Sequence, residues 1–207
     1  MHPLVLALSF VCGLAAQTQP QSQPASSAAS EASAKEEVAV ITTDVGQIVI
    51  RFFPDLAPNH VDNFKQLSRS RFYDGTSFHR VVPGFVIQGG DPNSKDDNPN
   101  NDGTGDGPRM LKAEFNDKPH MRGILSMARS RDPNSASCQF FIVLQESGKS
   151  RALDGKYTVF GEVIEGMDTV DRIVELAGQQ AARTQRPVKA VVMRTVRVEE
   201  RTVETGT

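Results

Sequence analysis

Short runs of β-branched and aromatic residues, separated by turn-forming residues, recur from residue 38 to about residue 200. Residues 38–43 and 47–52 are rich in Val and Ile, and the Asp-Val-Gly sequence between them is typical of a hairpin turn. This part of the chain therefore predicts a mainly β domain. Further strands are expected at residues 78–81, 85–89, 123–128, 138–144, 157–164 and 188–198.

Two segments have the periodicity of amphipathic helices instead. Pro58 begins a segment whose apolar residues recur at helical spacing as far as Leu67, and proline is favoured in the first turn of a helix. Residues 167–177 place their apolar side chains on one face, and Gly178 is expected to end that helix. Many short strands with two such helices predict a closed β-barrel whose open ends are capped by the helices. An α+β sandwich is the alternative.

The first 36 residues have a different composition. Residues 4–16 form an apolar run that is too short to cross a bilayer and ends in small residues, as a secretory signal does. A mis-assigned start or a buried apolar segment is the alternative, and Phe10 and Val11 argue against a lipid anchor at Cys12. Residues 17–36 contain no Val, Ile, Leu, Met or aromatic residue, which predicts a flexible tether.

These observations give a predicted organisation and location for the protein. We expect export, to the periplasm or the medium, and a monomer without a membrane span. The segments are a signal peptide at 1–16, a disordered linker at 17–36, a folded domain at 37–200 and a disordered tail at 201–207.

Charge and cysteine content exclude several classes of function. With 23 basic and 25 acidic residues the net charge is −2, which is not the basic footprint of a nucleic-acid binder. Two cysteines are too few for a disulfide framework, a four-cysteine zinc site or an iron–sulfur cluster. Residues 91–107 are rich in Asp, but the twelfth position of a calcium loop would be Arg109 instead of Glu. We therefore expect a solvated acidic loop, and no metal or cofactor.

A candidate groove is suggested by two dense segments. Arg80 lies on one short predicted strand, and Phe85 and Gln88 lie on the next. The segments 126–129 and 139–141 add a second arginine, an amide and two phenylalanines. A cationic fork beside aromatic and amide groups is what a peptide-binding groove requires. An ordinary β-core with an arginine at its rim is the alternative.

Three motifs together resemble the cyclophilin family of peptidyl-prolyl cis–trans isomerases. They are FHRVVPGFVIQGGDP at 78–92, GILSMAR…PNSASCQFFIVL at 123–144 and LDGKYTVFGEV at 153–163. The resemblance covers residues 38–200 and implies an eight-stranded antiparallel barrel closed by two helices. It also implies rotation about Xaa–Pro bonds in proline-containing peptides, without a cofactor.

The resemblance further implies roles for individual residues. Arg80 falls at the catalytic arginine, and Gln88 at the glutamine that supports it. Ala152 stands where some relatives have Trp, and the chain contains no Trp, so we expect weak binding of cyclosporin, the cyclic-peptide inhibitor of the family. The implied substrate-binding residues are Phe85, Val86, Ala128, Arg129, Gln139, Phe141, Leu153 and Tyr157.

The sequence thus predicts an isomerase that assists the folding of exported proteins. Two other interpretations remain open at this point. One is a non-catalytic proline-binding or holdase chaperone module of the cell envelope, which would use the same pocket without needing Arg80. The other is a tethered scaffold, which rests only on the signal and the linker.

Overall fold

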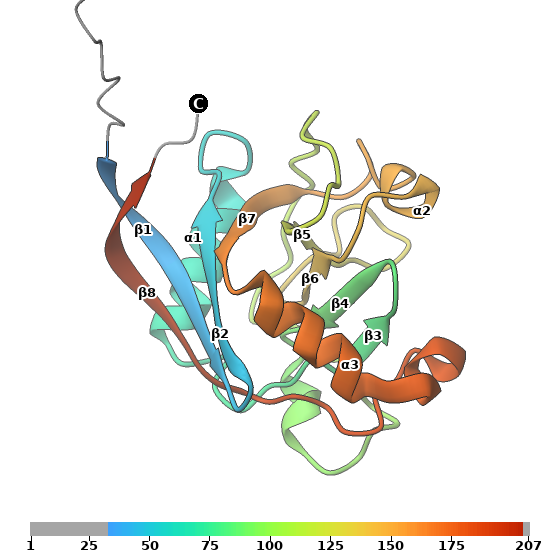
Figure 1. Ribbon diagram of the computed structural model, residues 1–207. Coiled ribbons are helices and arrows are strands. Elements are labelled where there is room, and N and C mark those ends of the chain that lie inside the picture. Colours follow the sequence, from blue (N-terminus) through green and yellow to red (C-terminus); the bar gives the residue numbers. More distant parts are fainter. Residues whose placement is uncertain (1–32, 205–207) are drawn as a thin grey trace, which may run out of the picture.

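The computed structural model describes residues 33–204, in which eight antiparallel strands form one sheet and three α-helices pack around it (Figure 1). The helices are α1 (Pro58–Arg69), α2 (Gly148–Arg151) and α3 (Met167–Thr184), and a short 3-10 helix covers Pro92–Lys95. The strands are β1 (Ser33–Thr43), β2 (Gly46–Phe52), β3 (Arg80–Val82), β4 (Val86–Gly89), β5 (Ile124–Met127), β6 (Phe140–Val143), β7 (Val159–Glu165) and β8 (Met193–Glu204).

The sheet is open, so the prediction of a closed barrel is wrong. Its strand order is β3-β4-β6-β5-β7-β2-β1-β8, which leaves β3 and β8 as the two edges. Among residues 33–204, these edges are joined only by one bridge, from Ser77 to Val192, which lies outside both strands. The three residues of β3 are too few to pair along the length of β8. The segment that follows α3 covers the outer edge of β3 instead. There the Gln185 carbonyl accepts a hydrogen bond from the Val81 N–H at 2.9 Å.

The helices also differ from the two that the sequence predicts. Helix α1 begins at Pro58 as expected. Gly178 interrupts α3 with φ 66° and ψ −177°, but the chain becomes helical again and continues to Thr184. The four-residue α2 was not predicted; Ser147 begins it with a reciprocal capping box to Ser150.

The predicted boundaries of the folded domain are too narrow. Strand β1 begins at Ser33 and β8 ends at Glu204, so residues 33–36 and 201–204, assigned above to the linker and the tail, belong to a two-stranded ribbon. The predicted signal and residues 17–32 lie outside the described residues. Within residues 33–204, no helix is both long and apolar enough to cross a membrane.

Alternation of side chains along the strands divides the apolar residues between two faces. The main core lies under α1 and α3, and Phe64 of α1 packs there against four aromatic rings. A smaller cluster occupies the other face of β4, β5, β6 and β7, and it supports the site described next. Its buried members are Val86, Ile124, Phe141, Val143 and Val159.

Candidate active site

The candidate site is built on rows of side chains that cross β3, β4 and β6. Arg80 is paired with Gln88, and Gln88 with Phe141. Residues directly opposite one another in antiparallel strands project from the same face. The period of two therefore brings a cation, an amide and an aromatic ring together from three strands that are far apart in sequence.

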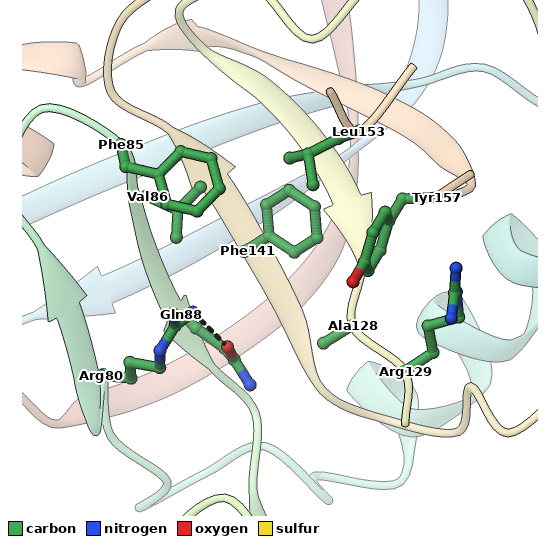
Figure 2. Close-up of a pocket in the computed structure, with 9 residues that line it drawn as sticks. All are labelled: Arg80, Phe85, Val86, Gln88, Ala128, Arg129, Phe141, Leu153 and Tyr157. Atoms are coloured by element: carbon green, nitrogen blue, oxygen red, sulfur yellow. Dashed lines mark hydrogen bonds between the residues drawn. The ribbon is translucent and has the colours of Figure 1, made fainter. Parts of the chain in front are cut away.

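These side chains line a pocket of about 200 Å³ (Figure 2). All nine lining residues were predicted from the sequence. The tenth predicted site residue, Gln139, does not line this pocket but is hydrogen-bonded to Gln88, which does. The structure thus brings the predicted set together, and the role of each residue in catalysis stays a prediction. The lining residues are Arg80, Phe85, Val86, Gln88, Ala128, Arg129, Phe141, Leu153 and Tyr157.

One side of the pocket is apolar. Figure 2 shows Phe85, Val86 and Leu153 gathered around the ring of Phe141. Phe141 is only 5% exposed, and the Tyr157 ring meets it edge-on with 5.7 Å between centroids. An apolar wall of this kind favours a ring or an aliphatic side chain over a charged one.

A polar cluster built on the buried His120 packs against the Phe141 ring. The His120 imidazole is stacked on the Phe141 ring, with 6.0 Å between the centroids and 18° between the planes. Its Nδ1 lies 2.8 Å from Asp154 Oδ1, and its Nε2 lies 3.0 Å from the Ser126 hydroxyl. Burial lowers the pKa of His120, so the neutral imidazole is favoured. Sequence reasoning missed this support, because His120 has no motif of its own.

The other side of the pocket is a chain of amides around Arg80. Arg80 Nη1 donates to Gln88 Oε1 at 3.1 Å, the bond drawn in Figure 2. Gln88 Nε2 then donates to Gln139 Oε1 at 2.9 Å, and Gln139 Nε2 donates to the Gly105 carbonyl at 2.8 Å. Arg80 Nε donates to Gln185 Oε1 at 2.8 Å.

The charge of Arg80 is not neutralised by these contacts, since both of its partners in the described chain are neutral amide oxygens. Burial lowers the pKa of Arg80 from its usual value. A guanidinium nevertheless remains protonated at any working pH. The pocket therefore presents a permanent cation beside an apolar wall.

Arg129 turns away from Arg80 and extends along the loop before β7. Its guanidinium carbon lies 4.6 Å from the centroid of the Tyr157 ring, and its Nη2 donates to the Lys156 carbonyl at 2.9 Å. A second cavity of about 340 Å³ shares Gln88, Ala128 and Arg129 with the pocket. The groove therefore continues past the pocket, with room for the residues that flank a bound side chain.

Ala152 is exposed at the C-terminal end of α2, beside Leu153, and it does not line the pocket.

The other residues singled out in the sequence have structural surroundings. Cys138 is buried, and burial raises the pKa of its thiol to about 12, which makes it unreactive. In the acidic loop, the buried Asp91 carboxylate accepts hydrogen bonds from the backbone N–H groups of Asn93 and Gly103. Within residues 33–204, no group of three His, Cys, Asp or Glu side chains is placed to hold a metal ion.

The fold and the site together present a pocket with an apolar wall on one side and the Arg80 guanidinium on the other. Comparison with known proteins gives the family. Residues 38–198 match the family model described as "Cyclophilin type peptidyl-prolyl cis-trans isomerase/CLD". The chain therefore belongs to the cyclophilin-type peptidyl-prolyl cis–trans isomerases, as the three motifs indicated, and is an enzyme that acts on proline-containing peptides.

Individual relatives agree with this assignment. A probable peptidyl-prolyl cis–trans isomerase of Brucella abortus is 38% identical over 161 residues, covering 75% of this chain and 81% of the relative. The enzyme of Synechococcus elongatus is 39% identical over 146 residues, covering 67% and 93%. The crystal structure of a cyclophilin-type isomerase from Cryptosporidium parvum, in the presence of the dipeptide Ala-Pro, has a TM-score of 0.68 and 29% identity. That match covers 78% of this chain and 98% of the other.

Proposed function

We propose that this isomerase acts on Xaa–Pro bonds of exported proteins and so assists their folding, with Arg80 as the group that stabilises the rotating bond. The observation that carries the catalytic part is the geometry of Arg80. Its guanidinium is held on the rim of the apolar pocket by two neutral acceptors, with its charge unpaired among the described residues.

The reaction requires stabilisation of a twisted amide. Resonance opposes rotation about the Xaa–Pro bond with a barrier of about 20 kcal/mol. When the bond twists, the proline nitrogen loses its conjugation and gains a lone pair that can accept a hydrogen bond. An enzyme that binds this geometry better than either planar one accelerates rotation in both directions.

Each side of the pocket has a part in this mechanism. The wall of Phe85, Phe141 and Leu153 holds the proline ring while the preceding carbonyl swings. The guanidinium of Arg80, which lines the pocket, donates to the proline nitrogen as its lone pair forms. No bond is broken and no proton is transferred permanently, so the pocket needs no nucleophile or general base.

The proposal of export rests on the sequence alone. An apolar run at 4–16 is followed by a segment at 17–32 that is rich in Gln, Ser, Ala and Pro. Such a pair is typical of a signal and a tether. After cleavage at Ala16, Cys138 would be the only thiol, so no intramolecular disulfide could form in an oxidising compartment.

The catalytic proposal is tested with Arg80→Ala, assayed by protease-coupled cleavage of an Ala-Pro peptide. We expect kcat/KM to fall by roughly tenfold or more, because a positioned charged donor is lost. Arg80→Lys keeps the positive charge but loses the planar set of N–H donors of the guanidinium, so it should also be impaired. The matched control is Arg131→Ala, which removes an exposed arginine outside the pocket. Normal turnover by Arg80→Ala, with an unchanged circular dichroism spectrum, would overturn the mechanism.

Export and folding assistance need two separate measurements. N-terminal sequencing of protein recovered outside the cytoplasm should give Ala16 or Gln17 as the first residue. An intact Met1 on that protein would contradict a cleaved signal. In a refolding assay on an exported protein whose slow phase is proline isomerisation, the enzyme should accelerate that phase and Arg80→Ala should not. Equal acceleration by both would indicate holdase activity instead of isomerisation.

A further inference from the structure

The backbone of Gln185 is fixed between α3 and β3. Gln185 follows the last turn of α3 in the left-handed conformation, with φ 60° and ψ 8°, and its N–H donates to the Ala181 carbonyl at 2.9 Å. Its carbonyl accepts from the Val81 N–H at 2.9 Å. Figure 1 shows the end of α3 lying beside β3. The residue is thus held at both peptide groups, next to the strand that carries Arg80.

The side chain of Gln185 reaches Arg80 itself. Gln185 Oε1 accepts from Arg80 Nε at 2.8 Å, while Gln88 Oε1 accepts from Nη1 at 3.1 Å. These two acceptors come from opposite directions: Gln88 from β4 inside the sheet, and Gln185 from the segment outside its edge. A planar guanidinium that is bonded on two of its N–H edges has its plane and its direction set. Arg80 also lines the pocket, so these two bonds fix the guanidinium at the wall of the pocket.

We infer that Gln185 is a positioning residue of the isomerase, which orients Arg80 for the twisted Xaa–Pro bond. This inference rests on the proposed role of Arg80. Gln185 does not line the proline pocket but a neighbouring cavity of about 280 Å³, which shares Arg80 and Gln88 with it. Its contact with the pocket therefore passes through Arg80. Without it, the long arginine side chain keeps one anchor and samples more orientations, and a small misplacement of a catalytic group has a large effect on rate.

The left-handed backbone makes a decisive variant available. Gly adopts positive φ without a steric penalty, so Gln185→Gly removes the amide while relieving the backbone. Gln185→Asn also tolerates this conformation and keeps an amide, but its side chain is one methylene too short for the Arg80 contact. Gln185→Glu keeps both the length and the acceptor oxygen. The three variants therefore separate the side-chain contact from the fold.

In the Gly and Asn variants we expect kcat/KM to fall by about fivefold, the scale of one hydrogen bond to a charged group at an exposed site. The loss should appear in kcat with KM little changed, because the apolar wall is intact. The melting temperature should stay the same or rise. Gln185→Glu keeps an acceptor for Arg80 Nε but also pairs its charge, so its activity should lie between that of Gln185→Gly and that of the unmodified protein. Full activity in Gln185→Gly would overturn the inference, as would a loss that follows melting temperature.

Two controls match the change. Gln179→Ala removes an exposed glutamine from the same helix, and Arg71→Gly relaxes the other non-glycine residue with positive φ in the described chain. Neither should alter turnover.

A double-mutant cycle separates this inference from the proposed function. In an Arg80→Ala background, Gln185→Gly should cause no further loss, since its effect passes through Arg80. If Arg80→Ala is itself fully active, the proposed mechanism fails. If Arg80→Ala is impaired but Gln185→Gly is normal, only the role of Gln185 fails. Additive losses would show that Gln185 acts by a route other than Arg80, which also overturns the inference.

Discussion

Acid should destabilise this protein well above the pH at which its carboxylates are protonated, because its histidines are buried. The three histidines of the described chain, His60, His79 and His120, are 0%, 4% and 1% exposed. Desolvation lowers the pKa of each below the ordinary value of 6.5. Nearby carboxylates oppose this effect, Glu114 at His60 and Asp154 at His120, without reversing it.

The sign and the size of the effect follow from proton linkage. Between pH 6.5 and the lower folded-state pKa, the unfolded chain binds a proton at each histidine and the folded chain does not, so stability falls as pH falls. Each histidine accounts for at most about 1.4 kcal/mol per pH unit in this window, and three for about 4 kcal/mol. Above pH 7 this contribution levels off.

The carboxylates do not obscure this window. Hydrogen bonds from Arg197 lower the pKa of Asp74, and hydrogen bonds from His60 and Asn59 overcome burial to lower that of Glu114. Both carboxylates therefore stay ionised, folded or unfolded, above pH 5.5. Burial raises the pKa of Asp102, which works in the opposite direction but involves a single group.

The assay is urea unfolding of the full chain between pH 5.5 and pH 8, followed by circular dichroism. The free energy of unfolding should drop steeply below pH 6.5. Each histidine is replaced in turn by glutamine, in the variants His60→Gln, His79→Gln and His120→Gln. Each variant should lower the slope of the unfolding free energy against pH by the equivalent of up to one bound proton, whatever its stability at pH 8. A free energy that is flat across the range would refute the reasoning, as would a slope that none of the three variants changes.

Two further predictions concern activity. Turnover of an Ala-Pro peptide should be nearly flat between about pH 6 and pH 9, since Arg80 stays charged there; a bell-shaped profile would indicate acid–base catalysis. Cyclosporin should bind roughly 30- to 150-fold more weakly than it binds relatives with Trp at the position of Ala152, because an indole donor and ring face are missing. Calorimetry should show tighter binding by Ala152→Trp with little change in turnover, and tight binding by the unmodified protein would contradict this.

Local sequence patterns predicted most of the strands and the pocket, because the residues that carry the site alternate along strands with strong β propensity. Arg80, Gln88 and Phe141 come together because the strand register pairs them, and all three lie in the first two of the three sequence motifs. The helix beginning at Pro58 was equally visible, since it combines a favoured first residue with an apolar face.

What sequence reasoning missed depends on contacts between distant segments. Whether a sheet closes is decided by its edges, and nothing in residues 80–82 indicates that β3 is too short to pair with β8. The start of β1 was hidden because residues 33–36 include no β-branched or aromatic residue, and their strand structure depends on pairing with residues 201–204. Gln185 lies beyond the glycine expected to end its helix, and a glutamine gives no signal for left-handed backbone.

The ribbon at the ends of β1 and β8 determines how the enzyme can be joined to something else. Ser33 is paired with Glu204, so both ends of the described chain leave the molecule at one point. Figure 1 shows this point on the far side of the sheet from β3 and β4, which carry the groove. A fusion partner, an affinity tag or a surface attachment at either terminus therefore leaves the groove facing outward. The protein could be immobilised through either end for a flow assay and still accept a proline-containing peptide.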